Sequence, residues 1–61
     1  MDVRIHGSPK GNNLHDLWVG NDKAIEGESY AIVSQVWDAL MGMGNPGGEA
    51  REIADAIRQK F

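Results

Sequence analysis

The chain has 61 residues, no cysteine and a net charge of −3, with a sequence pI near 5.1. A chain this short has no room for a second domain and buries only about 60% of its unfolded surface, so we expect one small domain of marginal stability. Cysteine is absent, which excludes a disulfide framework and favours the cytoplasm, and the acidic balance disfavours nucleic acid, which proteins bind with Lys and Arg.

The first part of the chain, residues 1–26, is predicted to be rich in strands and loops. Residues 2–6 alternate polar and apolar side chains, the period-2 pattern of a half-buried strand. The run 7–13 contains two glycines and a proline and ends this strand. Residues 1–7 alternate charged and small apolar residues, unlike a signal peptide, so we expect no secretory leader.

Residues 14–19 are ambiguous. They fit one helical turn with Asn13 as its cap, and they also fit a strand. Residues 20–22 form a turn signal, after which residues 23–26 can return as another short strand. We favour a small antiparallel sheet or hairpin, followed by helices, in an α+β fold.

The hydrophobic period changes to 3.6 residues between positions 28 and 43, which predicts a first helix over 28–43. Its apolar side chains cover an arc of about 200°, twice the roughly 100° stripe of a helix that faces one layer. We therefore expect this helix to be covered from two directions. Gly42 and Gly44 can supply the left-handed conformation that ends it.

A second helix is predicted over residues 47–60, with Asn45 as its cap and Pro46 in its first turn. Its apolar residues form a single arc of about 100°, so it should pack on one side only. The two helices together predict a helical hairpin.

No pattern in the chain predicts an enzyme, a cofactor site or a metal site. Residues 42–47 spell G-x-G-x-x-G, but a helix precedes them where a dinucleotide fingerprint needs a strand, so we interpret them as a hairpin turn. The candidate polar side chains show no spacing typical of metal ligands or of a catalytic group. They are His6, His15, Asp16 and Asp38.

With no pattern that predicts an enzyme, we interpret the chain as a small acidic interaction module that binds another protein or itself. We expect it to act as an inhibitor or regulator in a bacterial or phage-infected cell. If the strands are too few to cover the second flank of the first helix, an apolar patch stays open there, and a homodimer or a partner would close it. No segment has transmembrane length, so we expect no membrane partner. The residues expected to contact the partner are Trp18, Tyr30, Val33, Trp37, Met41, Met43, Glu49, Glu52 and Asp55.

The alternative is a dimeric nucleic-acid-binding transcriptional regulator of the ribbon-helix-helix or helix-turn-helix type, because a strand followed by two helices is a plan of that class. Two features weaken this alternative. The predicted strand 2–6 lies more than twenty residues before the first helix, and the second helix is balanced in charge.

Overall fold

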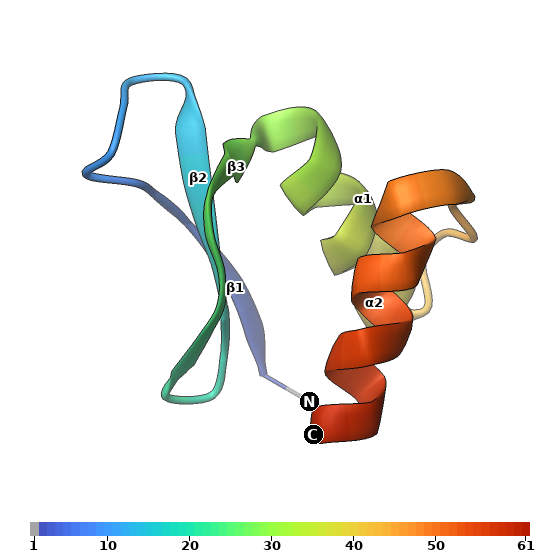
Figure 1. Ribbon diagram of the computed structural model, residues 1–61. Helices are drawn as coiled ribbons and strands as arrows, with labels where there is room; N and C mark the ends of the chain where they lie inside the picture. The colour runs from blue at the N-terminus through green and yellow to red at the C-terminus, as the bar shows by residue number, and fades with distance from the viewer. Residues whose placement is uncertain (1) are drawn as a thin grey trace.

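The computed structural model describes residues 2–61, and residue 1 of the predicted 1–26 part lies outside the described chain. A three-stranded antiparallel sheet precedes two helices (Figure 1), so the predicted α+β fold is confirmed. The elements are β1 (Val3–Gly7), β2 (Leu14–Val19), β3 (Asp22–Ser29), α1 (Tyr30–Met41) and α2 (Gly48–Lys60).

The strands follow one another in the order β1-β2-β3, which makes β2 the central strand. The connection from β2 to β3 has only two residues, Gly20 and Asn21, between the paired Val19 and Asp22. Gly20 has a φ of 61°, which a two-residue hairpin of this kind requires and which glycine adopts without steric cost. This tight turn brings β3 directly back along β2.

The ambiguous segment 14–19 is a strand and not a helical turn. Leu17 is paired with Ile5 on one side and with Ile25 on the other. A helical turn at this position would leave β1 and β3 without a central partner, and an isolated strand is not stable in water. Tertiary pairing therefore decides between two local patterns of similar strength.

Strand β3 extends beyond the predicted 23–26 on both sides and is irregular. Its pairing with β2 shifts register between His15 and Leu17 and again between Leu17 and Trp18. Extra residues in one strand of a pair form bulges, which bend and twist that strand. Bulges and charged side chains also make an edge strand a poor template for pairing with another chain.

The core lies between the sheet and α1. Leu17 of the central strand and Val33 and Val36 of α1 are fully buried. At the edge of the sheet, the indole N–H of Trp37 donates a hydrogen bond of 2.8 Å to the carbonyl oxygen of Val3, which ties α1 to β1. The other buried core residues are Val3, Val19, Ile25, Ala39, Ala50, Ala54 and Ile57.

Helix α1 is shorter than the predicted 28–43. It begins at Tyr30 because Glu28 and Ser29 still pair with β2, and the Ser29 hydroxyl caps it by accepting from the backbone N–H of Ile32. It ends at Gly42, whose φ of 74° gives the expected left-handed cap. Gly44, the other glycine expected in this role, does not have a positive φ.

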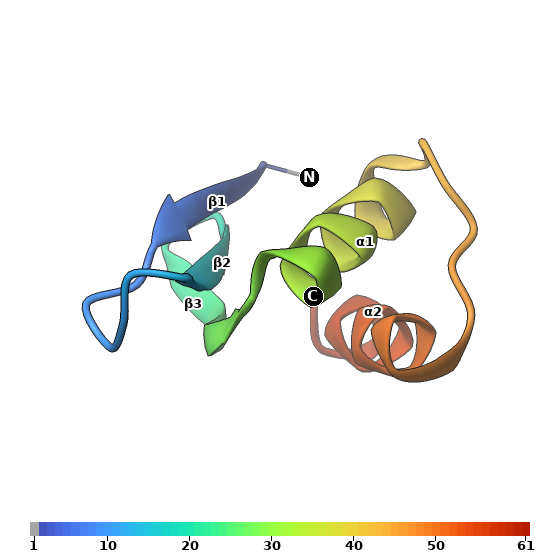
Figure 2. The ribbon, with the colours of Figure 1, turned by 90° about the horizontal axis from the view of Figure 1, so that it is seen from above.

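Helix α2 confirms the predicted hairpin but not its predicted cap. The N-cap residue is Gly47, so Asn45 and Pro46 lie in the connection and not in the first turn. The apolar side of α2 packs on α1, and the guanidinium of Arg58 donates to the carbonyl oxygen of Ala39 at the end of α1. Seen from above, the sheet, α1 and α2 follow one another as three layers (Figure 2).

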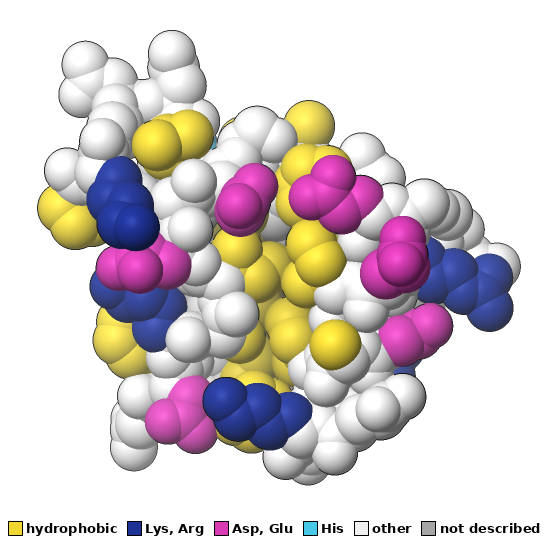
Figure 3. Space-filling model, viewed as in Figure 1, with side chains coloured by type: hydrophobic (Ala, Val, Ile, Leu, Met, Phe, Trp, Pro, Cys, Tyr) yellow, Lys and Arg dark blue, Asp and Glu magenta, His cyan; other side chains and the backbone are white. Residues whose placement is uncertain are grey.

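The two outer layers do not close completely over α1. Figure 3 shows apolar side chains in a strip between β3 and α2, with acidic side chains beside it. Ile32 of α1 and Ile53 of α2 are half-buried members of the core cluster. The sheet and α2 nevertheless pack on two different sides of α1, so the prediction that α1 is covered from two directions is confirmed.

Candidate functional site

A depression of about 390 Å³ lies on the face of the sheet that points away from α1, called the outer face below. Side chains of a strand alternate between its two faces, so Arg4 and His6 point outward while their neighbours Val3 and Ile5 face the core. The lining consists of Arg4, His6, Gly7, Pro9, Asp16, Trp18 and Lys23.

Strand pairing brings these residues together from distant parts of the chain. Across β1 and β2, Arg4 is the partner of Trp18 and His6 is the partner of Asp16. Across β2 and β3, Trp18 is the partner of Lys23. Partners on one face of antiparallel strands have their Cβ atoms about 5 Å apart, so the lining is contiguous.

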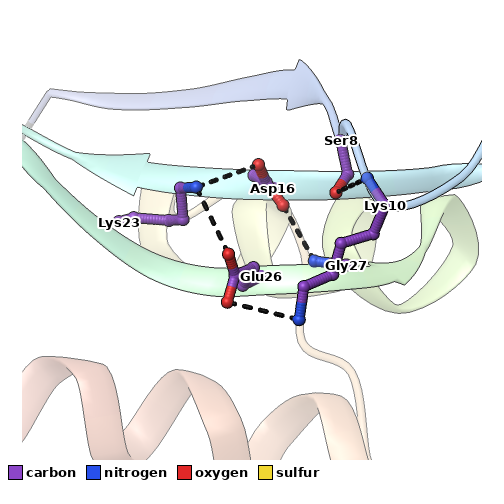
Figure 4. A network of polar contacts seen from close by, with 6 residues as sticks. All are labelled: Ser8, Lys10, Asp16, Lys23, Glu26 and Gly27. Atoms are coloured by element: carbon purple, nitrogen blue, oxygen red, sulfur yellow. Dashed lines mark hydrogen bonds and ion pairs between the residues drawn. The ribbon is translucent and has the colours of Figure 1, made fainter.

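Asp16 is the only polar residue that is buried among residues 2–61, with 2% of its surface exposed. Its Oδ1 accepts a hydrogen bond of 2.8 Å from the backbone N–H of Gly27, and its Oδ2 lies 3.5 Å from Nζ of Lys23 (Figure 4). Gly27 has a φ of 66° and lies in the irregular part of β3. The bulged strand thus directs an N–H to a carboxylate instead of to a strand carbonyl.

The pKa of Asp16 lies below 3.8, the ordinary value for aspartate. The hydrogen bond from Gly27 is the largest cause, because it stabilises the charged carboxylate. Burial opposes it and raises the pKa, while the Ser8 hydroxyl and the Lys23 ammonium lower it further. Asp16 is therefore ionised at neutral pH and acts as an acceptor, not as a proton donor.

Lys23 connects Asp16, which lines the depression, to Glu26, which is not part of the lining. Its Nζ lies 3.5 Å from Asp16, 3.5 Å from Oε2 of Glu26 and 5.5 Å from the centre of the Trp18 ring. Nζ of Lys10 lies 3.4 Å from Oε1 of Glu26, which extends the network to the loop after β1 (Figure 4). The ammonium of Lys23 is held by two carboxylates and an aromatic face at once.

Trp18 is half-buried and forms the aromatic wall of the depression. The ring of His6 stands at 74° to the Trp18 ring, with 6.5 Å between their centres. The guanidinium of Arg4 donates to the carbonyl oxygen of Gly20, and its Nε lies 3.7 Å from Asp2. The site therefore offers an aromatic surface and positioned hydrogen-bond donors, an arrangement suited to binding.

The apolar residues that the sequence assigned to partner contact do not form one surface. Val33 is fully buried in the core and Trp37 is half-buried against β1, so the sheet covers more of α1 than expected. Tyr30 is 56% exposed and packs its ring against that of His15, with 5.0 Å between ring centres. Met41 and Met43 are 41% and 70% exposed.

The acidic residues expected to contact a partner all lie on exposed positions of α2. Asp55 already binds two cations of its own helix, with Arg58 at 3.1 Å and Arg51 at 3.9 Å. Glu49 and Glu52 have no cation within 4 Å among residues 2–61. The contact of these three acidic residues with a partner stays a prediction.

The remaining candidates from the sequence lie apart from one another. The ring of His15 packs against that of Tyr30, and its Nδ1 is buried without a hydrogen-bond partner. Asp38 lies in α1, and its side chain is next to Gly44 of the connection between the helices. Within residues 2–61, no three His, Cys, Asp or Glu side chains gather where a metal ion could be held. The G-x-G-x-x-G run forms the hairpin connection, as expected from the preceding helix.

Of the residues that line this depression, only Trp18 was predicted from the sequence to contact a partner. Arg4, His6 and Lys23 are polar residues at alternate strand positions, which is the ordinary signature of a solvated face. The burial of Asp16 had no local signal either, because it follows from the place of Asp16 in β2, the strand that pairs on both sides. A central strand buries its residues more than an edge strand does, and a buried charge needs partners.

Comparison of the chain with protein-family models, curated proteins and solved structures gave no match. Within residues 2–61, neither helix has the length and apolar character that crossing a membrane requires.

Proposed function

We propose that the protein is a protein-binding module, a small regulator or inhibitor, that holds an apolar or aromatic side chain of its partner in the depression on the outer face. One observation carries this proposal: a face of the sheet that no helix covers is hollowed beside a half-buried tryptophan, Trp18. The depression has a volume of about 390 Å³, which suits one or two side chains.

The composition of the lining supports protein recognition. Trp, Tyr and Arg are enriched among the residues that dominate binding energy at protein interfaces. Trp18 and Arg4 are cross-strand neighbours on the outer face. The lining has two cations, Arg4 and Lys23, against one anion, Asp16. A single carboxylate of a partner segment can replace the exposed Asp2, whose Oδ2 lies 3.7 Å from Nε of Arg4, so the expected segment carries one next to its apolar side chain.

The pairing of the cations makes nucleic acid the weaker alternative. Arg4 is paired with Asp2, Lys10 with Glu26, and Lys23 with Asp16 and Glu26. Cations that are neutralised within the chain release few counterions from a phosphate backbone, and that release provides most non-specific affinity. In addition, β1 pairs with β2 of its own chain, whereas a ribbon-helix-helix protein pairs its strand with a second chain.

The test is a selection of peptides from a displayed library of random linear sequences on the immobilised protein. We expect the selected peptides to share an aromatic or large aliphatic residue beside Asp or Glu. In the Trp18→Ala variant, the affinity of the best peptide should fall by at least about 2 kcal/mol, or roughly thirtyfold. Titration calorimetry measures this affinity directly.

Met43→Ala is the matched control, since Met43 is exposed and lies outside the depression. It should leave peptide affinity unchanged. Peptides that bind Trp18→Ala as tightly as the wild type would place recognition elsewhere. Tight binding of a DNA duplex, weakening steeply with salt, would favour the regulator alternative instead.

A further inference from the structure

A strip of apolar side chains stays open to solvent between the edge strand β3 and α2, with α1 behind it (Figure 3). Ile32 precedes the buried Val36 and Ala39 by one and two helical turns, so it lies on the same flank of α1 as these core residues. Ile53 lies one turn before the buried Ile57 on α2. Both isoleucines are only half-buried. Ile32 and Ile53 are called the apolar strip below.

Two carboxylates beside the apolar strip have no cation of their own chain. Glu28 is the cross-strand partner of His15, whose ring packs on Tyr30 of α1, so Glu28 lies on the side of β3 that faces the helices. Glu49 lies one turn before Ile53 and shares its flank of α2. Both glutamates are exposed, and within the described residues 2–61 neither has a Lys or Arg within 4 Å. Their charge is therefore available to a partner.

The charge beside the apolar strip also has a direction. Figure 3 shows acidic side chains at its upper end, near the start of α2, and a basic side chain at its lower end. Interfaces are arranged so that a negative patch meets a positive one, and their centres are apolar. The partner that fits this surface presents large apolar side chains to the strip and Lys or Arg to its acidic end.

The two walls of the strip favour a helix over an extended segment. The register shifts in the pairing of β3 disturb the regular row of N–H and C=O groups to which another strand would pair. The other wall, α2, is a regular helix of 13 residues, and a second helix packs on such a surface by fitting its side chains between the ridges. An amphipathic helix laid on an apolar groove is a recurring mode of peptide recognition.

We infer that the apolar strip binds a basic amphipathic helix of a partner protein, with aliphatic side chains on Ile32 and Ile53 and with Lys or Arg beside Glu28 and Glu49. The strip lies on the helical side of the sheet and the depression on its outer face, so this inference does not depend on the proposed peptide site. The contact is small, and we expect a dissociation constant on the order of 100 µM.

Three synthetic peptides of about 14 residues, or four helical turns, test the chemistry of the partner. The first has a stripe of leucines and carries lysines in its last two turns, where the helix dipole favours cations. The second has glutamates in place of the lysines, and the third has alanines in place of the leucines. In titrations followed by NMR, the first peptide should shift the amide signals of Ile32 and Ile53 but not the indole signal of Trp18. The other two should bind at least about tenfold more weakly.

Two double variants of equal net charge locate the binding surface. Glu28→Gln with Glu49→Gln removes the carboxylates beside the strip, and it should weaken the first peptide at least about threefold at low salt. Glu26→Gln with Asp55→Asn is the matched control, because both carboxylates already bind cations of their own chain. It should leave the affinity within about twofold of the wild type. All four side chains are exposed, so both variants should fold, which circular dichroism checks.

Several results would each overturn the inference. One is a first peptide that does not bind up to about 1 mM, ten times the expected constant. Another is a glutamate peptide that binds as tightly as the lysine peptide. Equal losses in the two double variants would show a general effect of net charge. Shifts at the Trp18 indole in place of the strip would put the peptide in the depression, which would leave the proposed function standing and remove this second surface.

Discussion

The two faces of the sheet are built from the same three strands and have opposite roles. The inner face presents apolar side chains such as Val3 and Leu17 to α1, while the outer face presents Arg4 and Trp18 to solvent. Each outward residue is the immediate neighbour of an inward one. A step of one residue along β1 or β2 therefore separates the core from the proposed binding surface.

Asp16 and Leu17 show how different causes of burial act at neighbouring positions. Leu17 is 0% exposed because α1 and the neighbouring strands cover it with apolar side chains. Asp16 is 2% exposed because polar groups surround it, including the N–H of Gly27 and the ammonium of Lys23. The first kind of burial stabilises the fold directly, and the second requires that every partner stay in place.

The largest difference between the faces should appear in the pair Leu17→Ala and Trp18→Ala. Leu17→Ala leaves a cavity in the core and should lower the free energy of unfolding by about 2–5 kcal/mol, which a domain of this size can barely tolerate. Trp18→Ala removes a larger side chain from the outer face, yet should cost only about 1 kcal/mol. Urea unfolding followed by circular dichroism measures both. Equal losses would mean that Trp18 serves the core as much as Leu17 does.

A smaller effect is expected at Gly27, where the backbone supplies the partner of Asp16. Its φ of 66° is unfavourable for any other residue, and an added Cβ would lie 2.8 Å from Cδ of Lys10. Gly27→Ala should therefore lower the free energy of unfolding by more than about 1 kcal/mol. Gly7→Ala is the control, because its Cβ would meet nothing within 4 Å, and it should change stability by less than about 0.5 kcal/mol. If both substitutions cost the same, the left-handed bulge is not what matters.

The smallest effect is a change in how stability depends on pH. Because the pKa of Asp16 is lower in the folded state than in the unfolded chain, its ionised form stabilises the fold above the ordinary value of 3.8. This contribution is lost as the pH falls through the lower folded value. Asp16→Asn should therefore flatten the decline in the free energy of unfolding between about pH 5 and pH 2.

The control for this titration is Asp22→Asn, since Asp22 is exposed and has no cation within 4 Å among residues 2–61. It should leave the decline close to that of the wild type. An Asp16→Asn variant whose stability falls as steeply as the wild type would show that other carboxylates carry the acid sensitivity.

Local pattern was enough to predict both helices and the strand 2–6. The 3.6-residue period of α1 and α2, and the alternation in β1, are properties of consecutive residues and need no knowledge of the rest of the chain. The left-handed end of α1 at Gly42 was also predictable, because few residues other than glycine adopt this conformation. The α2 cap was predicted wrongly, since Asn45 and Gly47 are both acceptable caps and the path of the connection selects Gly47.

The sequence by itself determined which segments are helical, which faces of them are apolar and where the chain can turn. Only the tertiary structure decided that residues 14–19 form the central strand, and that His6 and Asp16 meet on one face. The same holds for the path of β3, whose bulge turns the N–H of Gly27 toward Asp16. Periodicity is set by neighbours within one or two turns, whereas strand register depends on the turns and bulges that join distant residues. For this reason the helices were readable from composition and spacing, and the site on the outer face was not.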